Sequence, residues 1–311
     1  MRVAVTGAGG RLGRAVVTAL EEAPFTGPFG PIAWSRGIFD LDNPEGVGRL
    51  LDRDRPEVVV HCAAWTDVDG CARDPELALR RNGAATGFLA RAAAERGIDL
   101  IVVSTNEVFD GRRTDGAGSG AGYGPDDPTN PINPYGASKL AGEVAAREAF
   151  AAAAIGGPAL GIARTAWLYG PPGNDFPAKI LAAADRAIAR GEALRLVADE
   201  IGSPSYTHDV AEAIAELIGA AAVGGTQHLV NEGRTSRADW ARELLRQAGV
   251  DVPTEDVPGS TWPRAATPPA WAVREPTALP GGEPLRPWQA ALADYLPSLV
   301  RDRARAAAAG R

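Results

Sequence analysis

The feature that most constrains the fold is a set of three glycines near the N-terminus, spaced three residues apart: Gly7, Gly10 and Gly13. They follow an apolar run, Val3 to Val5, and open an amphipathic stretch from Leu12 to Glu22. This order predicts a strand, a tight turn and a helix, with backbone N–H groups free to face a pyrophosphate. The helix N-terminus would attract the same anion. We therefore expect a dinucleotide-binding turn rather than a plain strand-to-helix connection.

The first half of the chain alternates short β-rich runs with helical stretches, which is typical of βαβ units on a parallel sheet. Two of the runs, Val58 to Val60 and Leu100 to Val103, are apolar at every residue, as expected for strands covered on both faces. The predicted strands are 2–6, 31–35, 58–62, 100–104 and 160–164, and the predicted helices are 12–22, 75–96, 134–154, 176–190 and 208–217. We predict an α/β fold with a doubly wound, Rossmann-like parallel sheet and a smaller C-terminal α/β substrate-binding part.

The domain boundaries follow from where this alternation becomes irregular. We expect residues 1–160 to form mainly the NAD(P)-binding domain, with some segments returning from later sequence. Residues 161–300 would form mainly the substrate-binding domain, and 301–311 a tail that ends in a fraying helix. A Gly-, Pro- and Asp-rich stretch over 111–134 predicts a long loop of the kind that often acts as a lid.

Composition excludes several classes of function. The net charge of -7 and the scattered arginines argue against nucleic acid as a partner. No stretch of 18 apolar residues is present, so we expect neither a membrane span nor a membrane partner. Cys62 and Cys71 form no CxxC pair and stand in no Cys/His cluster, so no metal site is expected. Without a charged leader at the N-terminus, the predicted location is cytoplasmic.

The end of the second predicted strand bears on which cofactor the turn would bind. NAD-specific folds usually place an acidic residue there to bind the ribose 2′-hydroxyl. Here Ser35 and Arg36 offer a hydroxyl and a cation instead, which favours NADP(H) over NAD(H), although NAD(H) stays possible and Arg36 could simply be solvated. Asp40, Leu41 and Asp42 lie just beyond and could cover the adenine ring.

Three residues form a candidate catalytic trio. Tyr135 and Lys139 are four residues apart, so on a helix their side chains share one face. An adjacent ammonium stabilises a phenolate and would lower the pKa of the phenol from about 10 towards neutrality. Lysine occurs only at 139 and 179, so this ammonium stands out in an arginine-rich chain. Thr105 ends a central strand, where ligands of open α/β sheets bind, and its hydroxyl could stabilise negative charge on a substrate carbonyl.

With these motifs, the chain resembles the extended short-chain dehydrogenase/reductases, and within them the dTDP-4-dehydrorhamnose reductase family. The resemblance covers nearly the whole length in seven blocks of shared order and spacing: Gly7 to Gly13, His61 to Asp69, Ser104 to Gly111, Asn133 to Glu143, Arg164 to Tyr169, Gly173 to Phe176 and Asp199 to Pro204.

The resemblance implies hydride delivery from NAD(P)H to the 4-keto group of a nucleotide-activated deoxysugar, with Tyr135 as the proton donor. Lys139 would hold the nicotinamide ribose, and Thr105 would polarise the ketone and contact the substrate. The other residues it implies as cofactor contacts are Arg11, Leu12, Ala63, Ala64 and Thr66. Those it implies as substrate contacts are Trp167, Ser203 and Pro204. Family members often pair, so a homodimer is possible.

Three departures from the family pattern leave the sugar open. Asn106 and Glu107 stand where Asp-Tyr is usual, and the loop over 112–122 looks longer. Residues 268–272 replace an expected Arg-Pro-x-Asn-Ser run. An epimerase or dehydratase of the same superfamily, another carbonyl reductase and a noncatalytic regulatory relative are therefore alternatives. A dehydratase is disfavoured because it would carry an acidic pair at Asn106 and Glu107.

Overall fold

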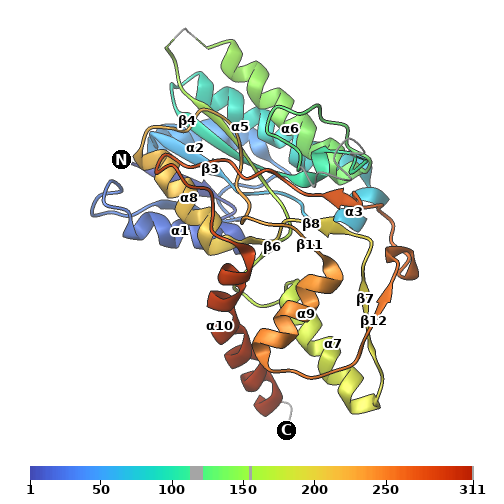
Figure 1. Ribbon diagram of the computed structural model, residues 1–311. Coiled ribbons are helices and arrows are strands. Elements are labelled where there is room, and N and C mark those ends of the chain that lie inside the picture. The colour runs from blue at the N-terminus through green and yellow to red at the C-terminus, as the bar shows by residue number, and fades with distance from the viewer. Residues whose placement is uncertain (113–121, 154–155, 310–311) are drawn as a thin grey trace.

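The structure is a computed structural model that describes residues 1–112, 122–153 and 156–309 of the 311-residue chain. Its centre is a six-stranded parallel sheet with strand order β10-β5-β4-β3-β1-β2 (Figure 1). The strands are β1 (Val3–Thr6), β2 (Ile32–Trp34), β3 (Val58–His61), β4 (Asp99–Thr105), β5 (Leu160–Thr165) and β10 (Gly225–His228). The strand order reverses direction at β1 and β3, so the predicted doubly wound α/β fold is confirmed.

Helices cover both faces of this sheet because alternate strand residues point to opposite sides. Val3 and Val5 pack with α1 (Arg11–Glu22) and α8 (Thr207–Gly219), while Ala4 packs on the other face. That second face is covered by three helices: α2 (Val47–Asp54), α5 (Ala85–Ala94) and α6 (Pro134–Ala151). The fully apolar strands of the sequence are thus explained by burial on both sides.

The helix predicted over 75–96 is divided into three pieces. After α3 (Val68–Arg73) come α4 (Pro75–Ala78), the π-helical η2 (Leu79–Ala84) and α5. Asn82 lies in η2, and its amide exchanges hydrogen bonds with the backbone N–H and C=O of Trp65 and donates to Ser138. The widened turn therefore holds a buried amide between the loop after β3 and helix α6, an arrangement that helical periodicity does not reveal.

A smaller part of the molecule lies below the sheet in Figure 1 and surrounds its own core of large side chains, including Leu181, Trp240 and Tyr295. Its helices are α7 (Phe176–Arg190), α9 (Arg237–Ala248) and α10 (Trp288–Ala309). Its strands are β6 (Leu168–Tyr169), β7 (Leu194–Val197), β8 (Ile201–Gly202), β9 (Ser205–Tyr206), β11 (Thr235–Ser236), β12 (Thr254–Val257) and β13 (Trp271–Ala272). Short 3-10 turns complete the fold at η1 (Pro44–Gly46), η3 (Asn106–Val108) and η4 (Gly259–Thr261).

Later sequence returns to the large sheet through α8 and β10, so neither part is a continuous segment. The division near residue 160 stays a proposal. The lid expected over 111–134 includes 113–121, which lie outside the described residues. Within the described ranges, no helix combines the length and apolar character needed to cross a bilayer.

Candidate active site

The glycine turn has the geometry that the sequence predicts. Gly7 has a φ of +63°, and its carbonyl oxygen accepts a hydrogen bond from Gly10 N at 2.8 Å. A Cβ added at Gly13 would lie 2.2 Å from the same oxygen, and one at Gly7 would lie 2.8 Å from Ala63 N. Side chains at these positions would therefore push α1 and the loop after β3 away from the turn. The close approach of α1 to β1 depends on glycine.

Two cavities meet at this turn, at the carboxyl ends of the parallel strands. The distal cavity, about 510 Å³, is lined by residues after β2 and β3, among them Ser35, Arg36, Asp40, Leu41, Ala63 and Ala64. The central cavity, about 420 Å³, is lined by residues that include Leu12, Gly13, Thr66, Thr105, Tyr135, Lys139 and Trp167. Both cavities share Gly7, Gly10, Cys62 and Ala64, so they adjoin at the turn and together are called the groove. An extended molecule with its phosphates over the turn would fit this groove.

The predicted trio converges in the central cavity. Thr105 is the last residue of β4, while Tyr135 and Lys139 lie in the first two turns of α6. Helix α6 begins there because Asn133 caps it, accepting a hydrogen bond from Gly136 N at 2.9 Å, and Pro134 follows the cap. All three residues of the trio are less than 10% exposed. They can therefore act in a largely dehydrated site.

The electrostatics of Tyr135 differ from the sequence-based expectation. Burial raises the pKa of its phenol above the usual 10, and the Glu107 carboxyl acts in the same direction. A hydrogen bond with Thr105 opposes these effects without overcoming them. The expected lowering towards neutrality was wrong for the protein alone, because burial of the phenolate, together with the Glu107 carboxyl, outweighs the hydrogen bond with Thr105. The phenol stays protonated at neutral pH, as a proton donor requires.

Lys139 responds to the same burial in the opposite sense. Burial lowers the pKa of its ammonium to about 8, partly offset by the Glu143 carboxylate. Its positive charge contributes to lowering the pKa of His61 to about 3, after the larger effect of burial. His61 is held as a neutral ring between the hydroxyls of Thr6 and Thr86, at 2.8 and 3.1 Å. Lys139 is therefore the cation closest to titrating near neutral pH in this cavity.

A third cavity, about 240 Å³, adjoins the central one and is called the side cavity here. Its lining includes Glu107, Trp167, Glu200, Arg237 and Arg264. The guanidinium carbon of Arg237 lies 3.6 Å from the centre of a Trp167 ring, so an arginine covers the indole that we expected to face a sugar. Trp167 also has a φ of +44°, an uncommon conformation for a bulky residue that often marks a functional position.

The remaining predicted residues fall into two groups. Arg11 lines the central cavity, but its guanidinium donates hydrogen bonds to Pro172 O at 2.9 Å and to Asp175 at 3.2 Å, and also contacts Gly170 and Asn174. Ser203 and Pro204 are buried and line none of these three cavities; the Ser203 hydroxyl accepts from Arg274 N. Their contact with a substrate has no support from this arrangement.

Sequence reasoning did not find several polar residues of the groove. Arg237 and Glu200 come from separate segments and form an ion pair, with Nε and Oε2 3.4 Å apart. Arg81 enters the distal cavity from η2, and Asn82 ties the loop after β3 to α6. No local pattern marks these positions, since each becomes relevant only through long-range packing.

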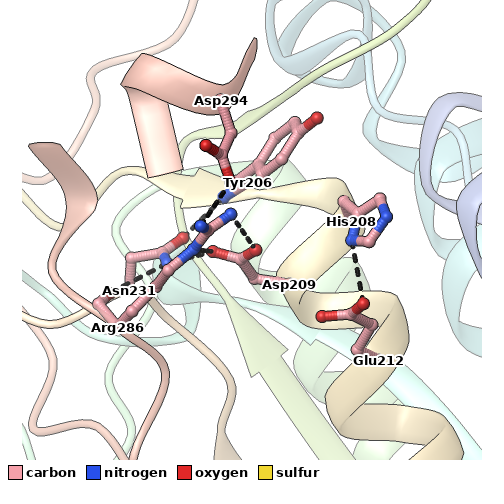
Figure 2. Close-up of polar contacts among 7 residues, drawn as sticks. All are labelled: Tyr206, His208, Asp209, Glu212, Asn231, Arg286 and Asp294. Atoms are coloured by element: carbon pink, nitrogen blue, oxygen red, sulfur yellow. Dashed lines mark hydrogen bonds and ion pairs between the residues drawn. The ribbon is translucent and has the colours of Figure 1, made fainter. Parts of the chain in front are cut away.

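A larger cavity, about 1020 Å³, lies elsewhere, lined by residues that include parts of α1 and α8, and its lining contains none of the trio. His208 and Glu212 line it and lie near Asp209, which makes this the one set of potential metal-binding side chains in the described part of the chain. Figure 2 shows that Asp209 points the other way, towards Arg286 and Asn231. Both Asp209 oxygens accept hydrogen bonds there, so the group resembles an ion-pair network that joins α8 to the start of α10. We place the active site by its chemistry rather than by volume.

A doubly wound sheet, a glycine turn, and a Tyr and Lys one helical turn apart beside a strand-end hydroxyl define an extended short-chain dehydrogenase/reductase that depends on NAD(P). Comparison with known proteins narrows this class. The RmlD substrate binding domain model matches residues 1–301, and the chain belongs to this family of NAD(P)-dependent reductases.

Individual relatives are similar to this chain over nearly its whole length. The dTDP-4-dehydrorhamnose reductase of Streptomyces griseus is 37% identical over 307 residues, covering 95% of this chain and 93% of that protein. The crystal structure of a dTDP-4-dehydrorhamnose reductase from Clostridium acetobutylicum has a TM-score of 0.85 at 30% identity, covering 96% of this chain and 99% of that one. A Bacillus anthracis dTDP-4-dehydrorhamnose reductase in complex with NADP has a TM-score of 0.81, also at 30% identity, and covers 96% and 99%.

Proposed function

We propose that this protein reduces the 4-keto group of a nucleotide-activated deoxysugar similar to dTDP-4-dehydrorhamnose, with NADP(H) preferred over NAD(H). The observation that carries the proposal is the convergence of Thr105, Tyr135 and Lys139 in a cavity that adjoins a second cavity at the glycine turn. The names of the relatives support the keto-sugar substrate, and the NADP complex of the Bacillus anthracis relative supports the cofactor. Ser35 and Arg36 in the distal cavity support the preference for a 2′-phosphate.

The chemistry follows from the positions of the trio. NAD(P)H, when bound along the groove, would supply a hydride for the carbonyl carbon. The Thr105 hydroxyl donates a hydrogen bond to the carbonyl oxygen, and the Tyr135 phenol transfers its proton to that oxygen as negative charge develops. Lys139 holds the ribose hydroxyls and stabilises the phenolate that remains. Burial keeps the phenol protonated until this transfer, as the raised pKa of Tyr135 requires.

Residues around the central and side cavities would bind the sugar. Trp167 lines both, and we propose it as a substrate contact through the indole edge, because Arg237 covers its ring face. The substrate roles of Ser203 and Pro204, a homodimeric state and a cytoplasmic location stay predictions.

A second candidate function is 4-ketoreduction of a different dTDP-linked sugar. A Streptomyces antibioticus relative, 33% identical over 305 residues, is described as a probable dTDP-4,6-dihydroxy-2-methyloxan-3-one 4-ketoreductase. Asn106 and Glu107, which depart from the family pattern, line both the central and the side cavity and favour a changed sugar. The intact trio disfavours a noncatalytic relative.

The test is NADPH oxidation by the purified protein, followed at 340 nm, with a panel of dTDP-4-keto-6-deoxy sugars. We expect oxidation that depends on the sugar, with NADPH used better than NADH. An epimerase would instead retain tightly bound NAD⁺ and change the sugar without net oxidation. A folded protein that oxidises no NADPH across the panel would contradict the proposal.

A further inference from the structure

An ion pair joins two of the residues that line the distal cavity. Arg81 on η2 donates two hydrogen bonds to Asp42, from Nε to Oδ1 and from Nη2 to Oδ2, each 2.6 Å long. Asp42 lies in the loop between β2 and η1, 39 residues earlier in the chain, and both residues line the cavity. The pair therefore connects two separate walls of the cavity by a bidentate contact, the geometry that best fixes a guanidinium plane.

Trp65 adds a second constraint on the same guanidinium. The guanidinium carbon of Arg81 lies 5.3 Å from the centre of the Trp65 ring, which also lines the distal cavity. The Arg81 side chain is 21% exposed, so most of it is shielded from water. A planar cation held by a carboxylate and an indole offers a flat surface on which an aromatic ring can stack.

The position of the distal cavity indicates which aromatic ring would lie against Arg81. One end meets Gly7 and Gly10 of the phosphate-binding turn, and Ser35 and Arg36 lie where the ribose 2′ position is expected. The remaining space, beside Arg81, is where the base of the same nucleotide would lie. We propose that Arg81 is a cofactor-binding residue whose guanidinium, positioned by Asp42, packs against the adenine ring. This inference rests on the proposed placement of NAD(P)H along the groove.

The two arginines of the cavity then have different tasks. Arg36 would recognise the 2′-phosphate, which is present in NADPH and absent from NADH. Arg81 would recognise adenine, which the two cofactors share. Since Asp42 already occupies two donors of Arg81, a stacking role suits this guanidinium better than a second phosphate contact. The affinities for the two cofactors should therefore separate the roles.

The experiment measures the Kd of NADPH and of NADH by fluorescence titration of the full-length protein and its variants. Arg81→Met should raise both Kd values by about 3- to 10-fold, in the range of a partly shielded cation–π contact. Arg36→Met should raise the Kd of NADPH alone. Asp42→Asn should raise both Kd values less than Arg81→Met does, and the double variant should bind no more weakly than Arg81→Met, because the two side chains act as one unit.

Arg80→Met provides the matched control, since Arg80 is exposed and lies outside the cavity lining. Its Kd values should stay within about twofold of those of the unmodified protein. Unchanged Kd values in Arg81→Met, with an unchanged melting temperature, would overturn the inference. A loss of affinity for NADPH alone, with an unchanged Kd of NADH, would also overturn the inference, because Arg81 would then be a phosphate ligand. If the unmodified protein bound neither cofactor, the proposed cofactor groove itself would be wrong.

Discussion

At the scale of single residues, burial sets the chemistry of the trio. The same low-dielectric surroundings raise the pKa of Tyr135 and lower that of Lys139 to about 8, because burial disfavours the charged form of each group. At neutral pH both groups are still protonated. The phenol is neutral because its pKa is raised, and the ammonium is charged because its lowered pKa of about 8 still lies above 7. A substrate oxygen that gains negative charge between Thr105 and Tyr135 would be stabilised by these donors with little water to compete.

The pKa of Lys139 predicts how activity depends on pH. The ammonium is charged below about pH 8 and neutral above it, so kcat/KM for the keto-sugar should fall as the pH rises through about 8. The variant Lys139→Arg should be slower but should not show this fall in kcat/KM at alkaline pH, since a guanidinium stays charged across the range. Initial rates from pH 6 to 10 test this. An identical alkaline limb in the arginine variant would show that another group titrates.

At the scale of elements, a buried ion pair fixes helix α6, which carries Tyr135 and Lys139, to the sheet. Glu143 on α6 and Arg164 on β5 are 0% and 3% exposed at their side chains, with Nη2 and Oε2 2.8 Å apart. Burial alone would raise the pKa of Glu143, but hydrogen bonding and the charge of Arg164 outweigh it and lower the pKa. Glu143 lies one turn after Lys139, and its charge partly offsets the lowering of the Lys139 pKa by burial.

Removing one partner of this pair should be costly. Arg164→Met should lower the free energy of unfolding by about 3–5 kcal/mol, because it leaves an uncompensated buried carboxylate. Urea unfolding at pH 7 measures this, and Arg147→Met is the control, since Arg147 contacts the same carboxylate but its side chain is 43% exposed. The pKa of Glu143 is lower in the folded protein than in the unfolded chain, where it is near 4.3. The pair therefore contributes its full stability above the unfolded pKa and loses it as the pH falls from there through the folded pKa. Equal stability of both variants would contradict the account.

At the scale of the whole molecule, Arg11 joins the glycine turn to the smaller part. It reaches from the start of α1 to the loop before α7, where Asp175 also caps α7 through Ala178 N at 3.0 Å and accepts from Gly170 N at 2.8 Å. One arginine thus links the glycine turn to the segment that leads into Phe176, which stacks on Trp240 with ring centres 4.5 Å apart. The glycine turn and the smaller part of the molecule are therefore connected through this side chain.

Loss of this link should loosen the loop without unfolding the turn. In Arg11→Met, amide hydrogen exchange over residues 170–178 should accelerate, while exchange in α1 stays slow, and the KM for the keto-sugar should rise more than the Kd of NADPH. Arg14→Met, which removes an exposed arginine bonded locally to Gly9 O, is the matched control. Faster exchange throughout α1 would indicate general destabilisation instead.

The fold and the trio could be predicted from sequence because their signals are local. Each signal, whether an apolar strand, the glycine turn or the Tyr-x-x-x-Lys helix, is contained in a few consecutive residues. The parallel sheet then brings the carboxyl ends of the strands to one edge. Three features depend on residues far apart in the chain and on how deeply packing buries them. They are the arginine over Trp167, the Arg81–Asp42 pair and the direction of the Tyr135 pKa shift. The π-helical η2 was missed for the same reason, since its cause is the long-range contact of Asn82.

The most direct test of the central claim is the substitution Tyr135→Phe, which removes one phenolic oxygen and keeps the ring. We predict that turnover with the keto-sugar falls by at least about 10²-fold, as expected for loss of general-acid catalysis, while the Kd of NADPH changes little. Turnover equal to that of the unmodified protein would contradict the assignment of Tyr135 as the proton donor.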